Sequence, residues 1–518
     1  MFRSCYQLFA ERAYKRADVI FYGHKTPVPT LLNNIDALAA SFSDIGLTVG
    51  DVVTLYLPTC PQAIAAFYAC SKCGLIANVV HPLTPLGKLK ANLQATKSKA
   101  LLFYDALVKD ERALADFEQI LVRCSVADYV SLRKPLYKLY SSVSGRRLSA
   151  KKCLTYAKLV ANKSVTEDVG DADLPVCYMH SGGTSGEPKT VVLPNRAFND
   201  LALSMVKRYD LPVECGEYSL VTLPVFHAYG LCAAIHAPLV MGFGLILVPK
   251  FGAKRVDGCI RRYNATFWTT VPVMLKKMLA CKRFCGKHLR KVKVIWCGGD
   301  AVDESLVKSV NEHFVRFGGT ARVMRGYGLT ETCGVCVVNT YGFNKTNTCG
   351  MPLPGCSVQI VGENGNVLPV GQKGEIVVSS VGAMSGYLGG ENTANGKIAT
   401  GDIGFLDADG YLTVVDRKKR MVKIAAVNVF PSEVEKVILS LPQIDEVCVV
   451  PVSVDGKTYL KAYVTLRSGA DNFNTSLVTE ICSQKLIKYA VPNFVEVLPQ
   501  MPRTKIGKID VYALQNKQ

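Results

Sequence analysis

The segment Ser181–Lys189, SGGTSGEPK, gathers three glycines, three hydroxyl side chains and a lysine into nine positions. Glycines leave backbone N–H groups uncovered, and successive N–H groups together with hydroxyl donors form a concave site for anions. The Lys189 ammonium is a compact charge that suits phosphate. The segment therefore predicts a phosphate-binding loop, with a flexible surface turn as the alternative on composition alone. It lacks the Gly-Lys-Ser/Thr ending of a Walker A loop.

Three further segments place chemically useful side chains directly after strand-like sequence. Gly298-Gly299-Asp300 would let a flat ring lie close to the backbone, with a plain tight turn as the alternative. The aromatic ring of Gly326-Tyr327-Gly328 can stack on a base, and the Thr330-Glu331 pair behind it offers the hard oxygen ligands that Mg²⁺ prefers. His227 follows SLVTLPVF. A lone histidine beside apolar residues is usually a satisfied core or cap residue, but its position after a strand raises the chance of a ligand-facing role.

Charged residues in the last part of the chain extend this set. Asp402 lies in a Gly-Asp turn between strands and could accept both hydroxyls of a ribose. The charge run Arg417–Lys423 marks a change of composition, and taken on its own it is best explained as a solvated linker face. Lys508, in a Gly-Lys turn near the C-terminus, is a mobile point charge.

Hydrophobic patterning predicts the elements that must position these residues. The apolar flanks LPVCYM and TVVLP predict a strand on each side of the phosphate loop, which makes it a hairpin loop. Residues 30–48 have helical spacing and precede a strand (VGDVVTLYLP), a helix (PQAIAAFYACSKCG) and a strand (LIANVVHP). This order suits a parallel sheet with right-handed crossovers. The 518 residues exceed one ordinary core, so an α/β protein of two or more domains is expected.

Composition narrows the class of ligand and the compartment. The net charge of +19 suits polyanionic partners, and without a zinc-finger or RNA-recognition signature we expect phosphorylated small molecules and no nucleic acid. The N-terminus lacks the apolar segment of a secretory signal, so reduced cysteines and a cytoplasmic location are expected. The CxxC pairs Cys70/Cys73 and Cys333/Cys336 have no second pair at zinc spacing, so neither is expected to bind metal, and the first is interpreted as core.

The segment Ser219–Pro249 contains no Asp, Glu, Lys or Arg. A span of this length could cross a bilayer, but Pro238 and several glycines interrupt it. A buried helix followed by a buried strand is therefore favoured. Peripheral contact with a membrane stays open.

Eight segments in this order resemble one family, the adenylate-forming superfamily of acyl-CoA synthetases, non-ribosomal peptide adenylation domains and firefly luciferases. They are SGGTSGEPK, PVFHAYG, CGGDAV, GYGLTET, GEI…SGYL, TGDIGFLDADGYL, DRKKRMVK and PRTKIGK. The resemblance implies a large N-terminal domain of αβ-layered sheets, residues 1–416, and a small mobile C-terminal α+β lid, residues 417–518, with a hinge at Asp416-Arg417. It also implies that a carboxylate attacks the α-phosphate of ATP, giving acyl-AMP and pyrophosphate, and that a thiol then displaces AMP.

The resemblance implies a role for each matched residue. Residues that would contact the nucleotide are Ser181, Gly182, Gly183, Thr184, Ser185, Gly186, Lys189, Gly298, Gly299, Asp300, Gly326, Tyr327, Gly328, Asp402, Arg417 and Lys423. The catalytic residues would be Lys508, Thr330, Glu331 and His227. Glu331 would hold Mg²⁺, Thr330 would contact the α-phosphate and His227 would face the acyl site. Lys508 would bridge the carboxylate and the α-phosphate in the first step.

Within the superfamily, the chain looks most like a stand-alone fatty acyl-CoA synthetase. The charge-free segment offers no carboxylate for a substrate ammonium, which disfavours amino acids, and the chain ends 10 residues after Lys508 with no carrier domain. The expected ligands are a medium- or long-chain fatty acid, ATP with Mg²⁺, and coenzyme A. An aryl- or coumarate-type CoA ligase is one alternative. An acyl-AMP ligase that loads a carrier-protein thiol is another, because Ala426 stands where relatives usually have a lid glycine. A luciferase-type oxygenase, a non-catalytic nucleotide-binding relative and a homodimer also stay open.

Overall fold

In the computed structural model the chain forms two compact units. Unit 1 consists of Met1–Val358 and Val378–Ile398, and unit 2 consists of Gln359–Val377 and Ala399–Gln518. The chain therefore crosses between the units inside three strands. The hinge expected at Asp416-Arg417 would be a point about which the C-terminal lid rotates, and it remains a prediction. The structure describes residues 4–108, 111–129, 153–181, 189–208, 216–390, 396–424, 427–454, 457–470, 473–503 and 509–517.

The first sheet of unit 1 consists mainly of parallel strands. Its order is β16 (Met351–Pro352), β15 (Val337–Val338), β14 (Arg322–Tyr327), β13 (Val294–Cys297), β12 (Ala265–Thr270), β10 (Tyr218–Val221), β11 (Gly244–Leu247), β1 (Asp18–Phe21) and β2 (His24–Pro27). The central strands are apolar throughout because both faces of the sheet are covered. In β11, Leu245 and Leu247 enter one core and Ile246 the other.

The second sheet carries the phosphate-loop hairpin near one edge. Its order is β19 (Gly386–Tyr387), β9 (Thr190–Pro194), β8 (Pro175–His180), β4 (Ile76–Val79), β3 (Val52–Tyr56), β5 (Ser98–Tyr104), β6 (Ile120–Cys124) and β7 (Leu154–Thr155). Strands β8 and β9 are antiparallel, as the hairpin interpretation predicts. The predicted strands around residues 52 and 76 are confirmed as β3 and β4, which are parallel neighbours.

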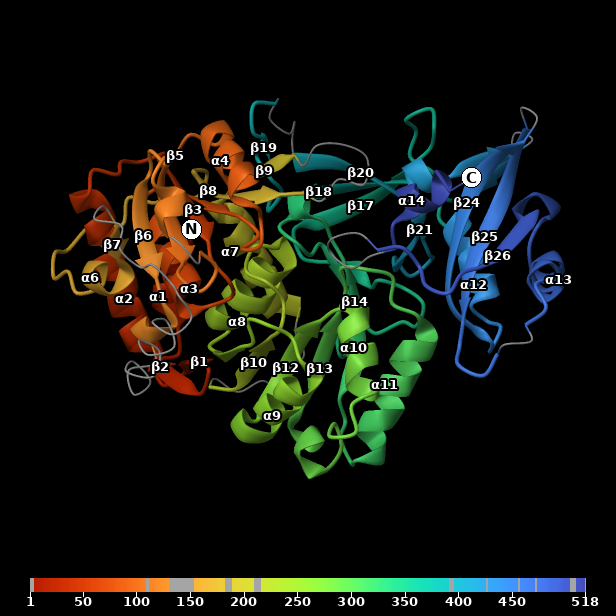
Figure 1. The fold of residues 1–518 in the computed structure, drawn as a ribbon, viewed down its shortest axis with the longest axis horizontal. Coiled ribbons are helices and arrows are strands. Elements are labelled where there is room, and N and C mark those ends of the chain that lie inside the picture. The colour runs from red at the N-terminus through yellow and green to blue at the C-terminus, as the bar shows by residue number, and fades with distance from the viewer. Residues whose placement is uncertain are drawn as a thin grey trace. The chain divides into compact units, whose positions relative to one another are not determined.

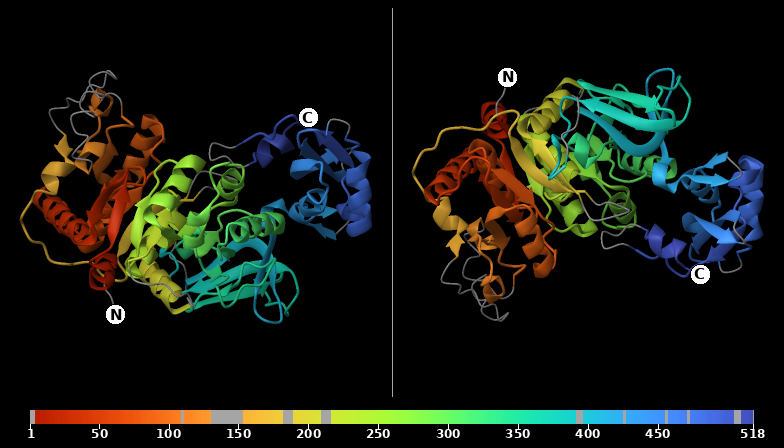
Figure 2. Two further views of the ribbon diagram at one scale, coloured as in Figure 1. Left: turned by 90° about the horizontal axis from the view of Figure 1, so that it is seen from below. Right: turned by 90° about the horizontal axis from the view of Figure 1, so that it is seen from above.

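Helices fill the space between the two sheets and cover their outer faces (Figures 1 and 2). The inner layer contains α2 (Val28–Asp44), α3 (Pro61–Lys72), α7 (Asn195–Arg208), the π-helix Tyr229–His236 and α8 (Ala237–Val240). The outer face of the first sheet is covered by α9 (Ala253–Tyr263), α10 (Pro272–Leu279) and α11 (Glu304–Arg316). Helix α4 (Leu86–Ala95) packs on the outer face of the second sheet. The expected αβ-layered architecture is confirmed.

The charge-free segment forms part of this core. Strand β10 leads into the π-helix and α8, and β11 follows, which confirms the buried helix and buried strand expected there. Every residue of α3 is buried, Cys70 included, so the first CxxC pair lies in the core. Among the described residues, no helix is long and apolar enough to cross a membrane.

Unit 2 is a small α+β unit, as expected for the C-terminal part. A sheet of order β17 (Cys356–Val361), β18 (Gly374–Ser380), β20 (Lys397–Leu406) and β21 (Leu412–Arg417) contains the strands in which the chain changes unit. Further elements are the hairpin β22 (Val422–Ile424) and β23 (Val427–Val429), the sheet β24 (Ile444–Val454), β25 (Lys457–Leu466) and β26 (Phe494–Val497), and the helices α12 (Pro431–Ile438), α13 (Ser476–Lys485) and α14 (Val511–Gln515). Helices α12 and α13 pack on one face of β24–β25, and α14 packs on the other.

Candidate active site

Three of the predicted segments meet at one edge of the first sheet. Strands β10, β12, β13 and β14 are parallel neighbours, so the segments that follow them leave the sheet at the same edge. His227 lies beyond β10, Gly298-Gly299-Asp300 follows β13, and Gly326-Tyr327 ends β14. Ligands of open α/β sheets bind outside the carboxyl ends of the strands. The fold therefore brings these candidates together at the edge where a ligand is expected.

The Gly298-Gly299 turn lies against a tyrosine that sequence reasoning did not single out. A Cβ atom on Gly298 would come within 3.8 Å of the Tyr229 ring, and Gly299 has φ +77°. The Tyr229 hydroxyl donates a hydrogen bond to the Trp296 carbonyl at 3.1 Å, which fixes the ring beneath the turn. The only sign in the sequence was its place in PVFHAYG.

The glycines around Tyr327 allow close approach between backbone segments. A Cβ atom on Gly328 would lie 2.4 Å from the Gly334 carbonyl oxygen. Gly334 has φ +100°, and a Cβ atom there would lie 2.9 Å from the backbone of Ala228 and Tyr229. The turn Thr330–Thr332 is therefore held tightly against the start of the π-helix. This packing sets the position of Thr330 and Glu331.

The ends of the phosphate-loop hairpin are closed by hydrogen bonds. The Ser181 N–H donates to the Lys189 carbonyl at 2.9 Å, and the Ser181 hydroxyl donates to the same oxygen at 3.3 Å. The predicted loop residues between them, Gly182, Gly183, Thr184, Ser185 and Gly186, lie outside the described residues.

A polar network at the base of this hairpin centres on His180, the last residue of β8. Its Nδ1 lies 3.1 Å from the Thr190 hydroxyl on β9, and its Nε2 lies 2.9 Å from Asn78 Oδ1 on β4. Burial lowers the pKa of His180 to about 4. The imidazole is therefore neutral near pH 7, where Nε2–H can donate to Asn78 while Nδ1 accepts from Thr190. No motif reasoning had selected this residue.

Lys189 and Glu331 both contact Tyr387. The Lys189 ammonium lies 4.7 Å from the centre of the Tyr387 ring, and the Tyr387 hydroxyl donates to Glu331 Oε1 at 2.9 Å. Burial and the Glu331 carboxylate raise the pKa of Tyr387, so the phenol keeps its proton and donates it. One side chain, that of Tyr387, thus contacts both the predicted phosphate ligand and the predicted metal ligand. Tyr387 belongs to the segment SGYL, but the sequence does not indicate these contacts.

Glu331 meets the chemical requirements of a Mg²⁺ ligand. One carboxylate oxygen is oriented by Tyr387, and no other hydrogen bond or ion pair holds this carboxylate within the described parts of the chain. The described residues contain no group of three or more metal-ligating side chains. Mg²⁺ commonly takes one or two carboxylates from a protein and completes its shell with water and substrate phosphates, so the carboxylate of Glu331 would be a sufficient protein contribution.

His227 is exposed at the start of the π-helix. Its Nδ1 accepts a hydrogen bond from the Tyr229 N–H at 3.2 Å, and its carbonyl accepts from the N–H groups of Gly230 and Leu231. The neighbouring Phe226 ring lies 4.4 Å from the His81 ring, centre to centre. His227 is therefore a surface residue fixed by a turn, rather than a buried core histidine.

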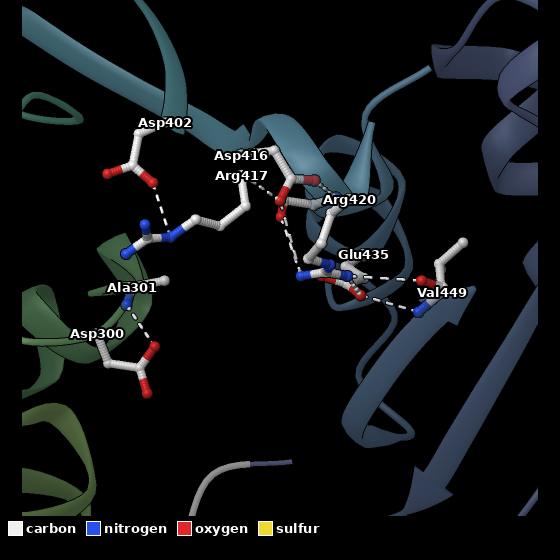
Figure 3. Close-up of polar contacts among 9 residues, drawn as sticks. Asp300, Ala301, Asp402, Asp416, Arg417, Arg420, Glu435 and Val449 are labelled. Atoms are coloured by element: carbon white, nitrogen blue, oxygen red, sulfur yellow. Dashed lines mark hydrogen bonds and ion pairs between the residues drawn. The ribbon is translucent and has the colours of Figure 1, made fainter. Parts of the chain in front are cut away.

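In unit 2, two predicted ribose contacts pair with one another (Figure 3). Asp402 and Arg417 are register partners in β20 and β21, and Arg417 Nε lies 2.7 Å from Asp402 Oδ1. The Asp402 side chain is 5% exposed and that of Arg417 is 52% exposed, so the guanidinium reaches solvent. Lys423 instead pairs with Glu363 at 2.9 Å on the surface.

The residue before Arg417 is bound into the same unit. Asp416 accepts hydrogen bonds from the Ser432 N–H at 2.9 Å and the Arg417 N–H at 2.7 Å, and Arg420 lies between Asp416 and Glu435 (Figure 3). Asp416 therefore stabilises the first turn of α12. Lys508 and Ala426 lie outside the described residues.

The two thiols of the second CxxC pair have different hydrogen-bond partners. Cys333 Sγ lies 3.1 Å from Cys232 Sγ, whereas Cys336 Sγ lies 3.6 Å from the Tyr327 carbonyl. Both thiols are buried.

Comparison with known proteins adds two family matches. Residues 10–388 match the model of the AMP-binding enzyme family. Residues 433–508 match the AMP-binding enzyme C-terminal domain.

Curated relatives cover nearly the whole chain. A long-chain-fatty-acid–CoA ligase of Bacillus subtilis (strain 168) is 29% identical over 525 residues, which cover 96% of this chain and 91% of the relative. The 4-coumarate–CoA ligase 1 of Arabidopsis thaliana is 26% identical over 502 residues, covering 92% and 85% respectively.

Solved structures share the fold. The o-succinylbenzoate CoA synthetase of Bacillus subtilis, in complex with the acyl-adenylate intermediate OSB-AMP, has a TM-score of 0.79 at 23% identity, covering 100% of this chain and 99% of that one. A benzoate CoA ligase of Burkholderia xenovorans LB400 has a TM-score of 0.82 at 19% identity, covering all of both chains. These likenesses confirm the arrangement of layered α/β sheets with a small C-terminal unit.

Proposed function

Because the chain belongs to the family of AMP-binding enzymes, we propose that it is an AMP-forming acid–thiol ligase. The carboxylate of an acid displaces pyrophosphate from the α-phosphate of ATP to give an acyl-adenylate, and the thiol of coenzyme A then displaces AMP to give the thioester. The observation that carries this proposal is the placement of a lysine ammonium and a glutamate carboxylate on one tyrosine beside the phosphate hairpin. An ammonium for phosphate and a hard oxygen for Mg²⁺ are what ATP requires.

The first step brings two anions together, so the protein must neutralise charge and position the reactants. Lys189 and the loop Ser181–Gly186 are proposed to hold the β- and γ-phosphates, which leave as pyrophosphate. Thr330 would contact the α-phosphate. Mg²⁺ held by Glu331 would supply further neutralisation of phosphate charge. Lys508 would bridge the attacking carboxylate and the α-phosphate.

The remaining predicted residues bind the nucleoside and the acid in this proposal. Gly298, Gly299 and Tyr327 frame the adenine, and the exposed Arg417 guanidinium with Asp402 holds the ribose hydroxyls. Lys423, which pairs with Glu363 on the surface, has the least support as a nucleotide contact.

The acid is proposed to be a medium- or long-chain fatty acid, bound beside His227. The chain beyond β10 passes through the charge-free, fully buried π-helix Tyr229–His236, which offers apolar rather than ionic contacts. An aryl acid of the coumarate type is the second candidate, and the curated relatives include ligases named for each class.

The test is pyrophosphate release across a panel of acids, with and without coenzyme A, followed by mass spectrometry of the products. Medium-chain and long-chain fatty acids, a coumarate, a benzoate and an amino acid make up the panel. We expect release with the fatty acids and a thioester when coenzyme A is present. Release without any thioester would point to an acyl-AMP ligase that loads a carrier protein. No release with any acid would overturn the proposal.

A further inference from the structure

Tyr387 contacts two side chains of opposite charge, and each of these lies next to a strand of a different sheet. Lys189 precedes β9 of the second sheet, and Glu331 lies in the turn that follows β14 of the first. The ring of Tyr387 faces the ammonium at 4.7 Å from its centre, and the hydroxyl donates to the carboxylate at 2.9 Å. One side chain thus offers each charge the group that it prefers, a π face for the cation and an O–H donor for the anion.

The backbone around Tyr387 is fixed to both neighbours. Strand β19 pairs with β9, with Tyr387 opposite Val191. The Leu388 N–H donates to the Thr190 carbonyl at 2.9 Å, directly after Lys189. The Met384 N–H donates to the Glu331 carbonyl at 2.9 Å. Residues 384–388 therefore fasten the phosphate hairpin to the turn that carries Glu331, and Tyr387 cannot shift without disturbing these bonds.

Keeping the two charges apart has a chemical consequence. Within the described parts of the chain, neither Lys189 nor Glu331 forms an ion pair, although a lysine side chain is long and flexible. A direct pair would neutralise both groups and occupy the carboxylate oxygen that a metal needs. The aromatic ring holds the ammonium on its face, and the hydroxyl engages only one carboxylate oxygen.

We propose that Tyr387 is a positioning residue that keeps Lys189 and Glu331 separate and oriented, so that the first can bind phosphate and the second can bind the metal that accompanies it. The inference rests on the proposed function, because it assumes that ATP enters with Mg²⁺. The hydroxyl serves the metal side of the site and the ring serves the phosphate side. The two parts can therefore be separated by substitution.

The test compares ATP binding by calorimetry in excess Mg²⁺ and in EDTA for the wild type, Tyr387→Phe and Tyr387→Leu. Phe keeps the ring and loses only the hydroxyl, so the affinity for ATP in EDTA should stay within about twofold of wild type. The factor by which Mg²⁺ raises the affinity for ATP should fall about tenfold, because the hydroxyl no longer orients Glu331. Leu also loses the cation–π contact, so binding in EDTA should weaken a further two- to fivefold or so. Tyr22→Phe is the matched control, because it removes an exposed phenol hydroxyl at the β1–β2 turn.

Equal Mg²⁺ dependence in the wild type and Tyr387→Phe would overturn the inference, as would an equal loss in both buffers. The Phe variant keeps the shape of the side chain, so the test does not depend on whether the Leu variant folds. A wild-type protein that binds no ATP in either buffer would overturn the proposed function, and this inference with it.

Discussion

Lys508 is the single residue expected to separate binding from chemistry. Its charge would act on the attacking carboxylate and the α-phosphate, whereas the phosphate hairpin is proposed to bind the pyrophosphate that leaves. Lys508→Ala should therefore lower ATP–pyrophosphate exchange by 10²-fold or more, roughly the cost of removing one preorganised charge contact. ATP affinity, measured by calorimetry, should change little. Lys517→Ala, which removes a surface lysine paired with Glu496, is the control. An exchange rate that survives in Lys508→Ala would refute this role.

One buried histidine, His236, and one half-buried histidine, His180, should make stability depend on pH. Burial lowers the pKa of His236 to about 3 and that of His180 to about 4. In the unfolded chain each imidazole binds a proton near pH 6.5, whereas in the folded chain it does so only well below that pH. The free energy of unfolding is therefore at its maximum above about pH 6.5 and decreases as the pH falls. Between pH 7.5 and 5.5 each histidine should account for about 1.4 kcal/mol of lost stability.

His236 offers the cleaner test of this dependence. It is fully buried, its Nδ1 lies 2.9 Å from the Tyr68 hydroxyl, and its Nε2 has no hydrogen-bond partner in the described structure. His236→Gln should flatten the pH dependence of the urea unfolding midpoint between pH 7.5 and 5.5. If the variant loses as much stability over this interval as the wild type, the histidine does not titrate as described.

Residue types and their places in the sequence were enough to predict candidate charged ligands, whose roles remain predictions. Lys189 was predicted as an ammonium at the rim of a glycine-rich loop, Glu331 as a hard oxygen ligand in a Thr-Glu pair, and Asp402 as a carboxylate in a Gly-Asp turn. Tyr229, Tyr387 and His180 could not be predicted in the same way. The contacts of Tyr387 with Glu331, of Tyr229 with Trp296 and of His180 with Asn78 join segments more than 50 residues apart. No local sequence pattern indicates such a contact.

At the level of elements, the turn that carries Glu331 depends on the close approach permitted by Gly334. A Cβ atom there would meet the Ala228 and Tyr229 backbone at 2.9 Å, in addition to the strain of φ +100°. Gly334→Ala should lower stability by about 1–3 kcal/mol and raise the KM for ATP, because the turn must move away from the π-helix. Thermal unfolding and steady-state kinetics measure the two effects.

Gly365 provides the matched control for backbone strain. Its φ is +79°, but a Cβ atom there would have nothing within 4 Å. Gly365→Ala should therefore show only the cost of the left-handed conformation, about 1 kcal/mol, with the KM for ATP unchanged. Equal effects of the two substitutions on the KM would show that the close contact at Gly334 does not position the site.

Regular periodicity explains which elements could be predicted. The hairpin β8–β9 and the strand–helix–strand order of β3, α3 and β4 were expected, because each has several residues of consistent pattern. The π-helix Tyr229–His236 was expected only as a helix, since its apolar residues do not distinguish helix types. Strand β19 has two residues, too few to show any periodicity. The connection that residues 384–388 make between the two sheets could therefore be recognised only in the structure.

At the scale of the whole molecule, the layered α/β class and a small C-terminal α+β unit followed from the order of elements and from the family resemblance. The exact division did not, because unit 2 takes up Gln359–Val377 and Ala399–Gln518. Where the chain passes from one unit to the other inside a strand, the amino-acid composition does not change at the boundary. The choice among fatty, aryl and other acids is likewise not fixed by the motifs, because their proposed roles are to bind ATP rather than the acid.

The central claim is that a carboxylate attacks the α-phosphate of ATP on this protein. The most direct measurement is the exchange of labelled pyrophosphate into ATP with Mg²⁺ and without coenzyme A, with each acid supplied in turn. We expect exchange that requires the acid and is strongest with medium- or long-chain fatty acids. Absence of exchange with every acid, or cleavage of ATP to ADP and phosphate, would contradict it.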